Sequence, residues 1–173
     1  IEDLTEIPVL NVKYLNTFKN EYPGLGGNYK VQHHTEFIME LFRDGSLSID
    51  GDLKGKRIVF HDPCYLGRAN QIYDAPRDLI KLLGVDLVEM KRSKARSFCC
   101  GAGGSQMFKD AEKGDKEINI DRTEEALKLN PELIATGCPF CNTMLTDGAK
   151  TIEDEKKVSV MDISELIAKA QDL

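Results

Sequence analysis

The chain has 173 residues, of which 41% are hydrophobic and 30% charged, as expected for a globular protein with its own core. Its net charge is −6 with scattered basic residues, which argues against a nucleic-acid-binding domain. The chain has no apolar run near the roughly 20 residues of a membrane span and no secretory signal, so we expect a cytoplasmic protein that reaches the inner membrane only through a partner.

The first fifty residues are predicted to form two strand–helix pairs that echo the end of the chain. Residues 6–17 can be aligned with residues 132–143, and residues 31–37 with residues 160–166 after a linker of different length. The match is weak residue by residue. The shared order of strand, helix, turn, strand and helix nevertheless indicates an internal repeat.

The repeat predicts two unequal parts. We expect residues 1–50 to be the tail of a first module whose front lies outside this chain. Residues 51–173 are expected to form one complete module. The boundary is placed in the acidic stretch 44–55, which contains three glycines.

The second part alternates short apolar runs with longer amphipathic stretches. Pro76 suits the first turn of a helix, and Gly84 suits the residue that ends it. The predicted strands are 57–61, 85–90, 133–136 and 158–161, the predicted helices are 76–83, 118–129, 142–150 and 163–171, and 91–104 is predicted as a loop. This alternation predicts an α/β fold with a mainly parallel sheet, helices on both faces and pseudo-repeated Rossmann-like half-modules.

All five cysteines lie in the second part, as Cys64, the pair Cys99 and Cys100, and the Cys-x-x-Cys of Cys138 and Cys141. An odd number of cysteines without a secretory signal argues against a disulfide framework. Each segment follows a predicted strand or lies in a glycine-rich loop, and such loops gather at the carboxyl edge of a parallel sheet. We therefore predict one metal site with thiolate ligands, which suit iron–sulfur clusters and zinc.

The adjacent pair Cys99 and Cys100 favours a cluster with several metal atoms, because neighbouring side chains diverge and chelate one small ion poorly. The glycine-rich run after this pair lets the backbone approach an inorganic core. Four thiolates are enough for tetrahedral zinc, so a structural zinc module without redox activity is the alternative. A redox-active dithiol formed by Cys138 and Cys141 is a third option, which leaves the other three cysteines unexplained.

The histidines are the other candidate site residues. His61 precedes the turn to Cys64, and a packed residue that orients the loop is favoured over a ligand or a proton donor. His33 and His34 face no cysteine in the repeat register, so structural roles are predicted for both.

Three segments together resemble the cysteine-rich CCG domain: His61–Cys64, Cys99–Gly104 and Gly137–Cys141. That domain occurs in heterodisulfide reductase catalytic subunits, and in the iron–sulfur subunits of glycolate oxidase and lactate-utilisation enzymes. The resemblance is close over residues 57–145, because the three segments agree in order and in approximate spacing.

The resemblance implies that all five cysteines hold a [4Fe-4S] cluster, which is non-cubane in heterodisulfide reductase, although zinc occurs in some relatives. It also implies an electron-transfer subunit or a fragment of an oxidoreductase. Electrons would come from a flavoprotein or ferredoxin-type partner and pass to a disulfide or a quinone-linked acceptor.

The first module departs from this pattern. Val12 and Leu15 stand where the repeat register places Cys138 and Cys141. The resemblance therefore implies no cluster in the first module.

Overall fold

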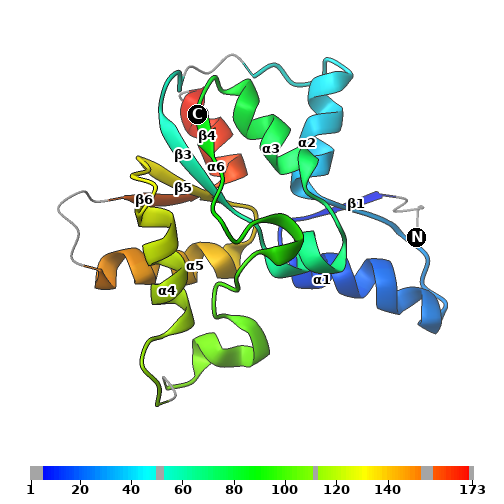
Figure 1. Ribbon diagram of the computed structural model, residues 1–173. Helices are drawn as coiled ribbons and strands as arrows, with labels where there is room; N and C mark the ends of the chain where they lie inside the picture. The colour runs from blue at the N-terminus through cyan, green and yellow to red at the C-terminus, as the bar shows by residue number, and fades with distance from the viewer. Residues whose placement is uncertain (1–5, 50–52, 111–112, 153–157, 172–173) are drawn as a thin grey trace.

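The computed structural model describes residues 6–49, 53–110, 113–152 and 158–171 (Figure 1). The strands are β1 (Glu6–Val9), β2 (Lys30–His33), β3 (Arg57–His61), β4 (Asp86–Val88), β5 (Leu133–Thr136) and β6 (Ser159–Asp162). The helices are α1 (Val12–Asn16), α2 (His34–Arg43), α3 (Asp74–Leu82), α4 (Ile118–Leu127), α5 (Pro139–Thr151) and α6 (Ile163–Ala170).

The predicted α/β fold with parallel strands is confirmed. The main sheet has the order β4-β3-β5-β6 with every pair parallel, and β1 and β2 form a separate parallel pair. His61, Thr136 and Asp162 lie in register at the carboxyl ends of β3, β5 and β6. The loops that carry the cysteines therefore leave the sheet at one edge.

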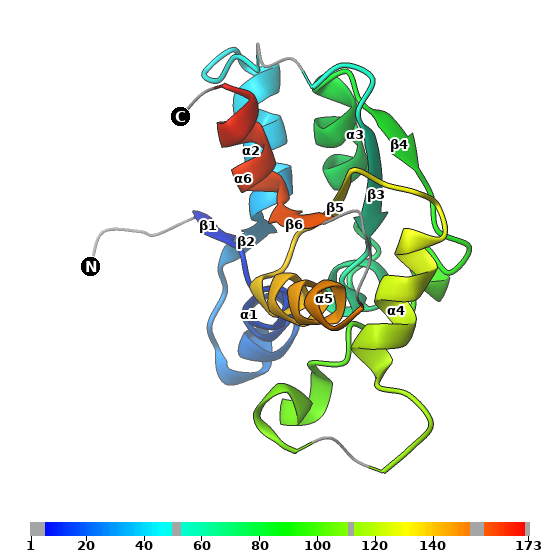
Figure 2. The same ribbon diagram turned by 90° about the vertical axis from the view of Figure 1, so that its left-hand side faces the viewer.

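Helices cover both faces of the main sheet. Figure 2 shows α2, α3 and α6 on one side of the strands, and α4 and α5 on the other. Successive side chains of a strand point to opposite faces, so Ile58 and Phe60 pack on one face and Val59 on the other. Because both faces are buried, the central strands are continuous apolar runs.

The described elements repeat their order along the chain. The series β1, α1, β2 and α2 is matched by β5, α5, β6 and α6. The carboxylate of Glu36 accepts a hydrogen bond from the backbone N–H of His33 at 3.1 Å. In the same position of the second series, Glu165 accepts from the backbone N–H of Asp162 at 2.8 Å. The division of the chain into two modules stays a prediction.

Several predicted elements have different bounds in the structure. Helix α3 begins at Asp74, so Pro76 is not its first residue as predicted. Helix α5 begins at Pro139 rather than at residue 142, with Cys138 as its N-cap, because proline is well suited to a first helical turn. Strand β4 is shorter than the predicted 85–90. The predicted loop 91–104 contains a 3-10 turn at Lys94–Arg96.

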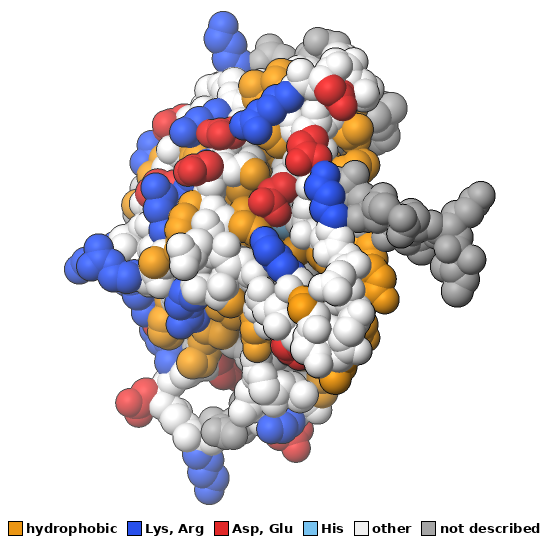
Figure 3. Space-filling view, turned by 90° about the vertical axis from the view of Figure 1, so that its right-hand side faces the viewer, with side chains coloured by type: hydrophobic (Ala, Val, Ile, Leu, Met, Phe, Trp, Pro, Cys, Tyr) orange, Lys and Arg blue, Asp and Glu red, His pale blue; other side chains and the backbone are white. Residues whose placement is uncertain are grey.

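The surface carries charges of both signs. Figure 3 shows basic and acidic side chains interspersed over one face of the molecule, with hydrophobic side chains between them. Among the described helices, none combines the length and the apolarity that crossing a bilayer requires.

Helices α4 and α5 lie close together at Gly148, which is buried in α5. A Cβ atom at this position would meet the Thr123 hydroxyl, the Asn119 carbonyl oxygen at 3.0 Å and the Thr123 Cβ at 3.1 Å. The hydroxyl can rotate away, but the carbonyl oxygen and the Thr123 Cβ cannot. The close approach of α4 to α5 therefore requires glycine here.

We expect Gly148→Ala to lower the free energy of unfolding by about 1–3 kcal/mol, the usual cost of overpacking. Alanine would otherwise favour the helix by up to about 1 kcal/mol. Urea unfolding measures the difference. Gly114→Ala is the control, because nothing lies within 4 Å of a Cβ there. A stabilised Gly148→Ala protein would show that the two helices can separate at low cost.

Candidate metal centre

The structure brings the five predicted cysteines together from three segments. Cys64 follows β3, the pair Cys99 and Cys100 lies on the loop between β4 and α4, and the last two cysteines open α5. The Cys141 Sγ lies 3.3 Å from the Cys100 Sγ. Thiol contacts also join Cys64 to Cys99, Cys99 to Cys100, and Cys138 to Cys141. The five sulfurs form one unbroken chain of contacts.

The cysteine cluster has a buried side and an accessible side. Cys100, Cys138 and Cys141 are buried, whereas Cys64 and Cys99 are partly exposed. An inorganic core held by these residues would be shielded on one side and within reach of solvent or a partner on the other.

Residues of the first fifty form part of the wall of this site. Val12 and Leu15 of α1 are buried in the same apolar group as Cys100, Cys138 and Cys141. These two positions correspond to cysteines in the predicted repeat, and they contribute apolar side chains to the same site. Apolar walls limit solvent access, which affects the reduction potential of a metal centre.

Backbone N–H groups point at two of the sulfurs. The N–H of Gly101 donates to the Cys99 Sγ at 3.3 Å. The thiols of Cys100 and Cys64, followed by the N–H groups of the glycine loop, lower the pKa of Cys99 far below its usual range. The thiol of Cys141, assisted by nearby backbone N–H groups, lowers the pKa of Cys138 to about 6. These two sulfurs are already stabilised as thiolates.

The neighbouring thiols keep their protons. The contact with Cys99 raises the pKa of Cys64, and the contacts with Cys100 and Cys138 raise the pKa of Cys141. Sulfurs this close cannot all ionise without nearby positive charge. Metal ions supply that charge and displace the protons. A set of five sulfurs, N–H donors and apolar walls fits an iron–sulfur cluster.

Gly101 is required by both backbone conformation and space. Its φ of +96° lies in the left-handed region, which side chains with a Cβ rarely adopt. An added Cβ would also lie 3.3 Å from the Met144 Cε and 3.4 Å from the Asn119 nitrogen. A side chain at Gly101 would therefore strain the backbone and push the Cys99–Cys100 loop away from α4 and α5.

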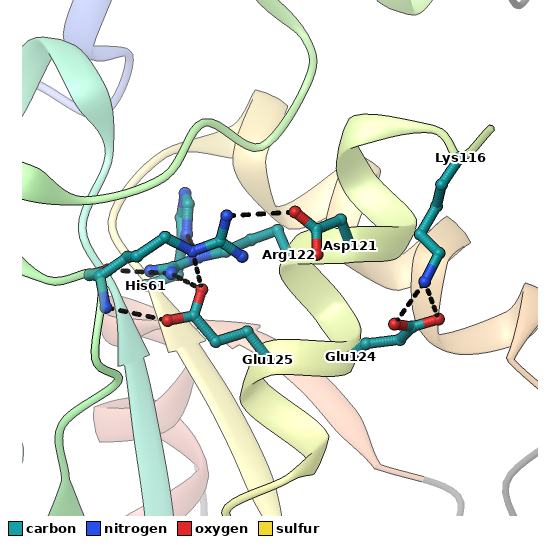
Figure 4. Close-up of polar contacts among 7 residues, drawn as sticks. His61, Lys116, Asp121, Arg122, Glu124 and Glu125 are labelled. Atoms are coloured by element: carbon teal, nitrogen blue, oxygen red, sulfur yellow. Dashed lines mark hydrogen bonds and ion pairs between the residues drawn. The ribbon is translucent and has the colours of Figure 1, made fainter. Parts of the chain in front are cut away.

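His61 lies on the buried side of the cluster, near Cys100 and Cys141. Its side chain is buried, and its Nδ1 accepts a hydrogen bond from the Arg122 Nε at 2.9 Å (Figure 4). Burial, reinforced by the charge of Arg122, lowers the pKa of His61 to about 3, so the ring is neutral. A ring nitrogen of His61 also lies within 4.8 Å of the Cys100 and Cys141 sulfurs. The sequence predicted that His61 is a packed residue at the end of a strand. It did not predict that Arg122 is its partner.

Arg122 is fixed by the loop that leads to Cys99. Its Nη1 donates to the Glu125 carboxylate at 2.8 Å and to the Arg92 carbonyl oxygen at 2.9 Å. The Arg92 Nε donates to the same carboxylate at 2.7 Å, and its guanidinium lies 3.9 Å from the ring centroid of Phe98. Figure 4 shows Arg122 and Glu125 on α4, with Arg122 directed toward His61 at the end of β3.

A buried ion pair joins the first two cysteine segments, those of Cys64 and Cys99. The Asp62 carboxylate accepts from the Arg77 Nη1 at 2.8 Å and the Arg77 Nη2 at 2.9 Å. It also accepts from the backbone N–H of Lys94 at 2.8 Å. Asp62 therefore connects the turn before Cys64, helix α3 and the loop before Cys99. Sequence reasoning missed this pair, because only the fold brings Arg77 to the end of β3.

His33 supports the third segment. Its Nε2 donates to the Gly137 carbonyl oxygen at 2.9 Å, and its Nδ1 lies 2.7 Å from the Thr35 hydroxyl, which donates to it. A Cβ at Gly137 would lie 3.0 Å from the ring. The predicted structural role of His33 is thus located at the residue directly before Cys138.

We expect His33 to make the protein less stable at mildly acidic pH. Burial, and then the neighbouring His34, lower the pKa of His33 to about 3, against 6.5 for an unperturbed histidine. Between pH 6.5 and pH 3 His33 is protonated in the unfolded chain but neutral in the folded chain. The free energy of unfolding therefore falls as the pH falls. The cost of this residue at pH 5 is about 2 kcal/mol. The pKa of Asp162 is also lowered in the folded protein, so protonation of this carboxylate at lower pH reduces the free energy of unfolding further.

Urea unfolding of the wild type and of His33→Gln at pH 7.5 and pH 5 measures this contribution. The variant should lose about 2 kcal/mol less between the two pH values. Equal losses in the two proteins would show that His33 does not titrate on unfolding.

Comparison with known proteins places this geometry in a family. The family model of the cysteine-rich domain named CCG matches residues 58–146. The probable iron-sulfur-binding oxidoreductase FadF of Bacillus subtilis is 47% identical over 97% of this chain, and EtfAB:quinone oxidoreductase of Syntrophomonas wolfei is 43% identical over 89%. A subunit of the dihydromethanophenazine:CoB--CoM heterodisulfide reductase of Methanosarcina barkeri is 34% identical over 88% of this chain. The chain spans 24%, 22% and 37% of the lengths of these relatives, respectively.

Proposed function

Because this chain belongs to the cysteine-rich CCG domain family, we propose that it is the cluster-binding part of an iron–sulfur oxidoreductase. Cys64, Cys99, Cys100, Cys138 and Cys141 would hold a [4Fe-4S]-type cluster, of which the non-cubane form is one variant. When bound, the cluster accepts and donates electrons, and the chain supplies the thiolates, the N–H donors and the apolar wall.

The contact chain of the five thiols carries this proposal. Four sulfurs would complete a tetrahedral zinc site and leave one surplus, whereas five sulfurs from three loops can surround several metal atoms. The iron–sulfur name of the Bacillus subtilis relative favours the same choice and gives the zinc alternative no support.

The route of the electrons is proposed from the relatives and from the exposure of the site. Cys64 and Cys99 are the partly exposed cysteines, so electrons would enter or leave on their side. The relative named EtfAB:quinone oxidoreductase favours a quinone-linked acceptor, and a flavoprotein or ferredoxin-type protein is the donor that we propose. The more distant heterodisulfide reductase relative makes a disulfide the second candidate acceptor. Contact with a membrane would then be peripheral, through a partner protein.

Metal analysis of protein purified without oxygen tests the proposal. We expect about four irons and four acid-labile sulfides per chain, with visible absorbance that bleaches on reduction. About one zinc without sulfide would overturn the electron-transfer function and leave a structural module.

A further inference from the structure

One polar atom beside the cysteine cluster has no partner among the residues that the structure describes. The His61 side chain is 1% exposed, and its Nε2 makes no hydrogen bond within these ranges. A ring nitrogen of the same histidine lies within 4.8 Å of the sulfurs of Cys100 and Cys141. An unpaired buried polar atom costs free energy, so an unpaired Nε2 on a ring this close to two sulfurs requires an explanation.

Arg122, the partner of the His61 Nδ1, fixes the tautomer of the His61 ring. The Arg122 Nε carries a hydrogen and cannot accept, so the His61 Nδ1 offers its lone pair to it over 2.9 Å. A neutral imidazole with an unprotonated Nδ1 carries its proton on Nε2. Arg122 cannot turn away, because Glu125 and the Arg92 carbonyl oxygen hold its Nη1. The Nε2 atom, which has no partner among the described residues, is thus an N–H donor. Figure 4 shows the His61 ring beside Arg122.

The same hydrogen bond argues against His61 as a metal ligand. A ligating histidine donates its second N–H to a carboxylate, a carbonyl oxygen or water. The second nitrogen of His61 instead accepts from a guanidinium. Metal binding at Nε2 would then leave the ring without any proton, as an anionic imidazolate in a buried site.

We propose that His61 donates its Nε2–H to a sulfur of the metal centre, either the Cys100 or Cys141 thiolate or a sulfide between them, and that Arg122 locks the donating tautomer. This inference rests on the proposed iron–sulfur function. The donor stabilises negative charge on sulfur, and a reduced cluster carries one more negative charge than an oxidised one. The hydrogen bond therefore raises the reduction potential.

Reduction potentials of the cluster-loaded protein test the proposal. His61→Phe removes the donor, and its potential should fall by about 59 mV, which corresponds to a tenfold change in a one-electron equilibrium. His61→Gln places an amide N–H near the position of the imidazole Nε2, so it should recover most of this shift. His34→Gln is the control. His34 is also a buried histidine, but its Nε2 lies 3.0 Å from the Asp162 carboxylate and not beside the Cys100 and Cys141 sulfurs. An unchanged potential in His61→Phe would overturn the inference, and so would a loss of iron from both His61 variants, which identifies a ligand.

Pulsed electron paramagnetic resonance of the reduced wild-type protein, labelled with ¹⁵N-histidine, gives an answer that does not depend on how the variants fold. A hydrogen-bonded donor gives weak nitrogen coupling together with an exchangeable proton. Strong nitrogen coupling identifies a ligand, and no coupling identifies a packing role; either result overturns the inference. If the protein holds iron and sulfide, a negative result rejects only the role of His61, whereas absence of iron rejects the proposed function.

Discussion

Cys99→Ser is expected to lose most of the bound iron and the visible absorbance. Cys99 is an inner member of the contact chain, next to both Cys64 and Cys100. It also receives the Gly101 N–H at 3.3 Å. A serine hydroxyl does not ionise here and is a poor ligand for iron–sulfur clusters, which take thiolates. Retention of iron should fall at least about tenfold, as it does when the supporting groups of metal sites are removed.

Iron and sulfide assays on matched preparations measure the effect, and Cys138→Ser should behave in the same way from a different segment. Ser159→Ala is the control, because this exposed residue begins β6 away from the cysteines. A Cys99→Ser protein with the full iron content would remove this residue from the ligand set.

Arg77→Met is expected to lower the free energy of unfolding by about 3–5 kcal/mol. Arg77 is 4% exposed and forms two hydrogen bonds with Asp62, which is 1% exposed. Methionine fills similar space but leaves the carboxylate buried without its counter-charge. The loops of Cys64 and Cys99 both depend on Asp62, so the variant should also lose its cluster faster when exposed to a chelator.

Glu89→Gln is the control for Arg77→Met, because Glu89 is the other acidic partner of Arg77. The Arg77 Nε donates to Glu89 at 2.6 Å, but the Glu89 side chain is 39% exposed. Exposed partners contribute little, so Glu89→Gln should cost less than about 1 kcal/mol. Urea unfolding at neutral pH compares the two. A larger loss in Glu89→Gln than in Arg77→Met would show that the buried pair is not the stabilising one.

The amino-acid sequence by itself determined the central strands and the cysteine segments. Buried parallel strands are short apolar runs, and β3 and β5 have the bounds that these runs predict. Loops after parallel strands meet at one edge of a sheet, so cysteines distant in sequence could be expected to converge. These inferences need only local patterns and one general property of parallel sheets.

Only the tertiary structure decided which residues hold that edge in place. His33 reaches Gly137 over 104 positions of sequence, and Arg122 reaches His61 over 61. Such partners follow no periodicity, because a hydrogen bond between distant segments depends on how helices pack on the sheet. The tautomer of His61 is likewise set by Arg122 and by no neighbour in sequence. Sequence located the sulfurs, and packing selected the groups that orient them and the donor that faces them.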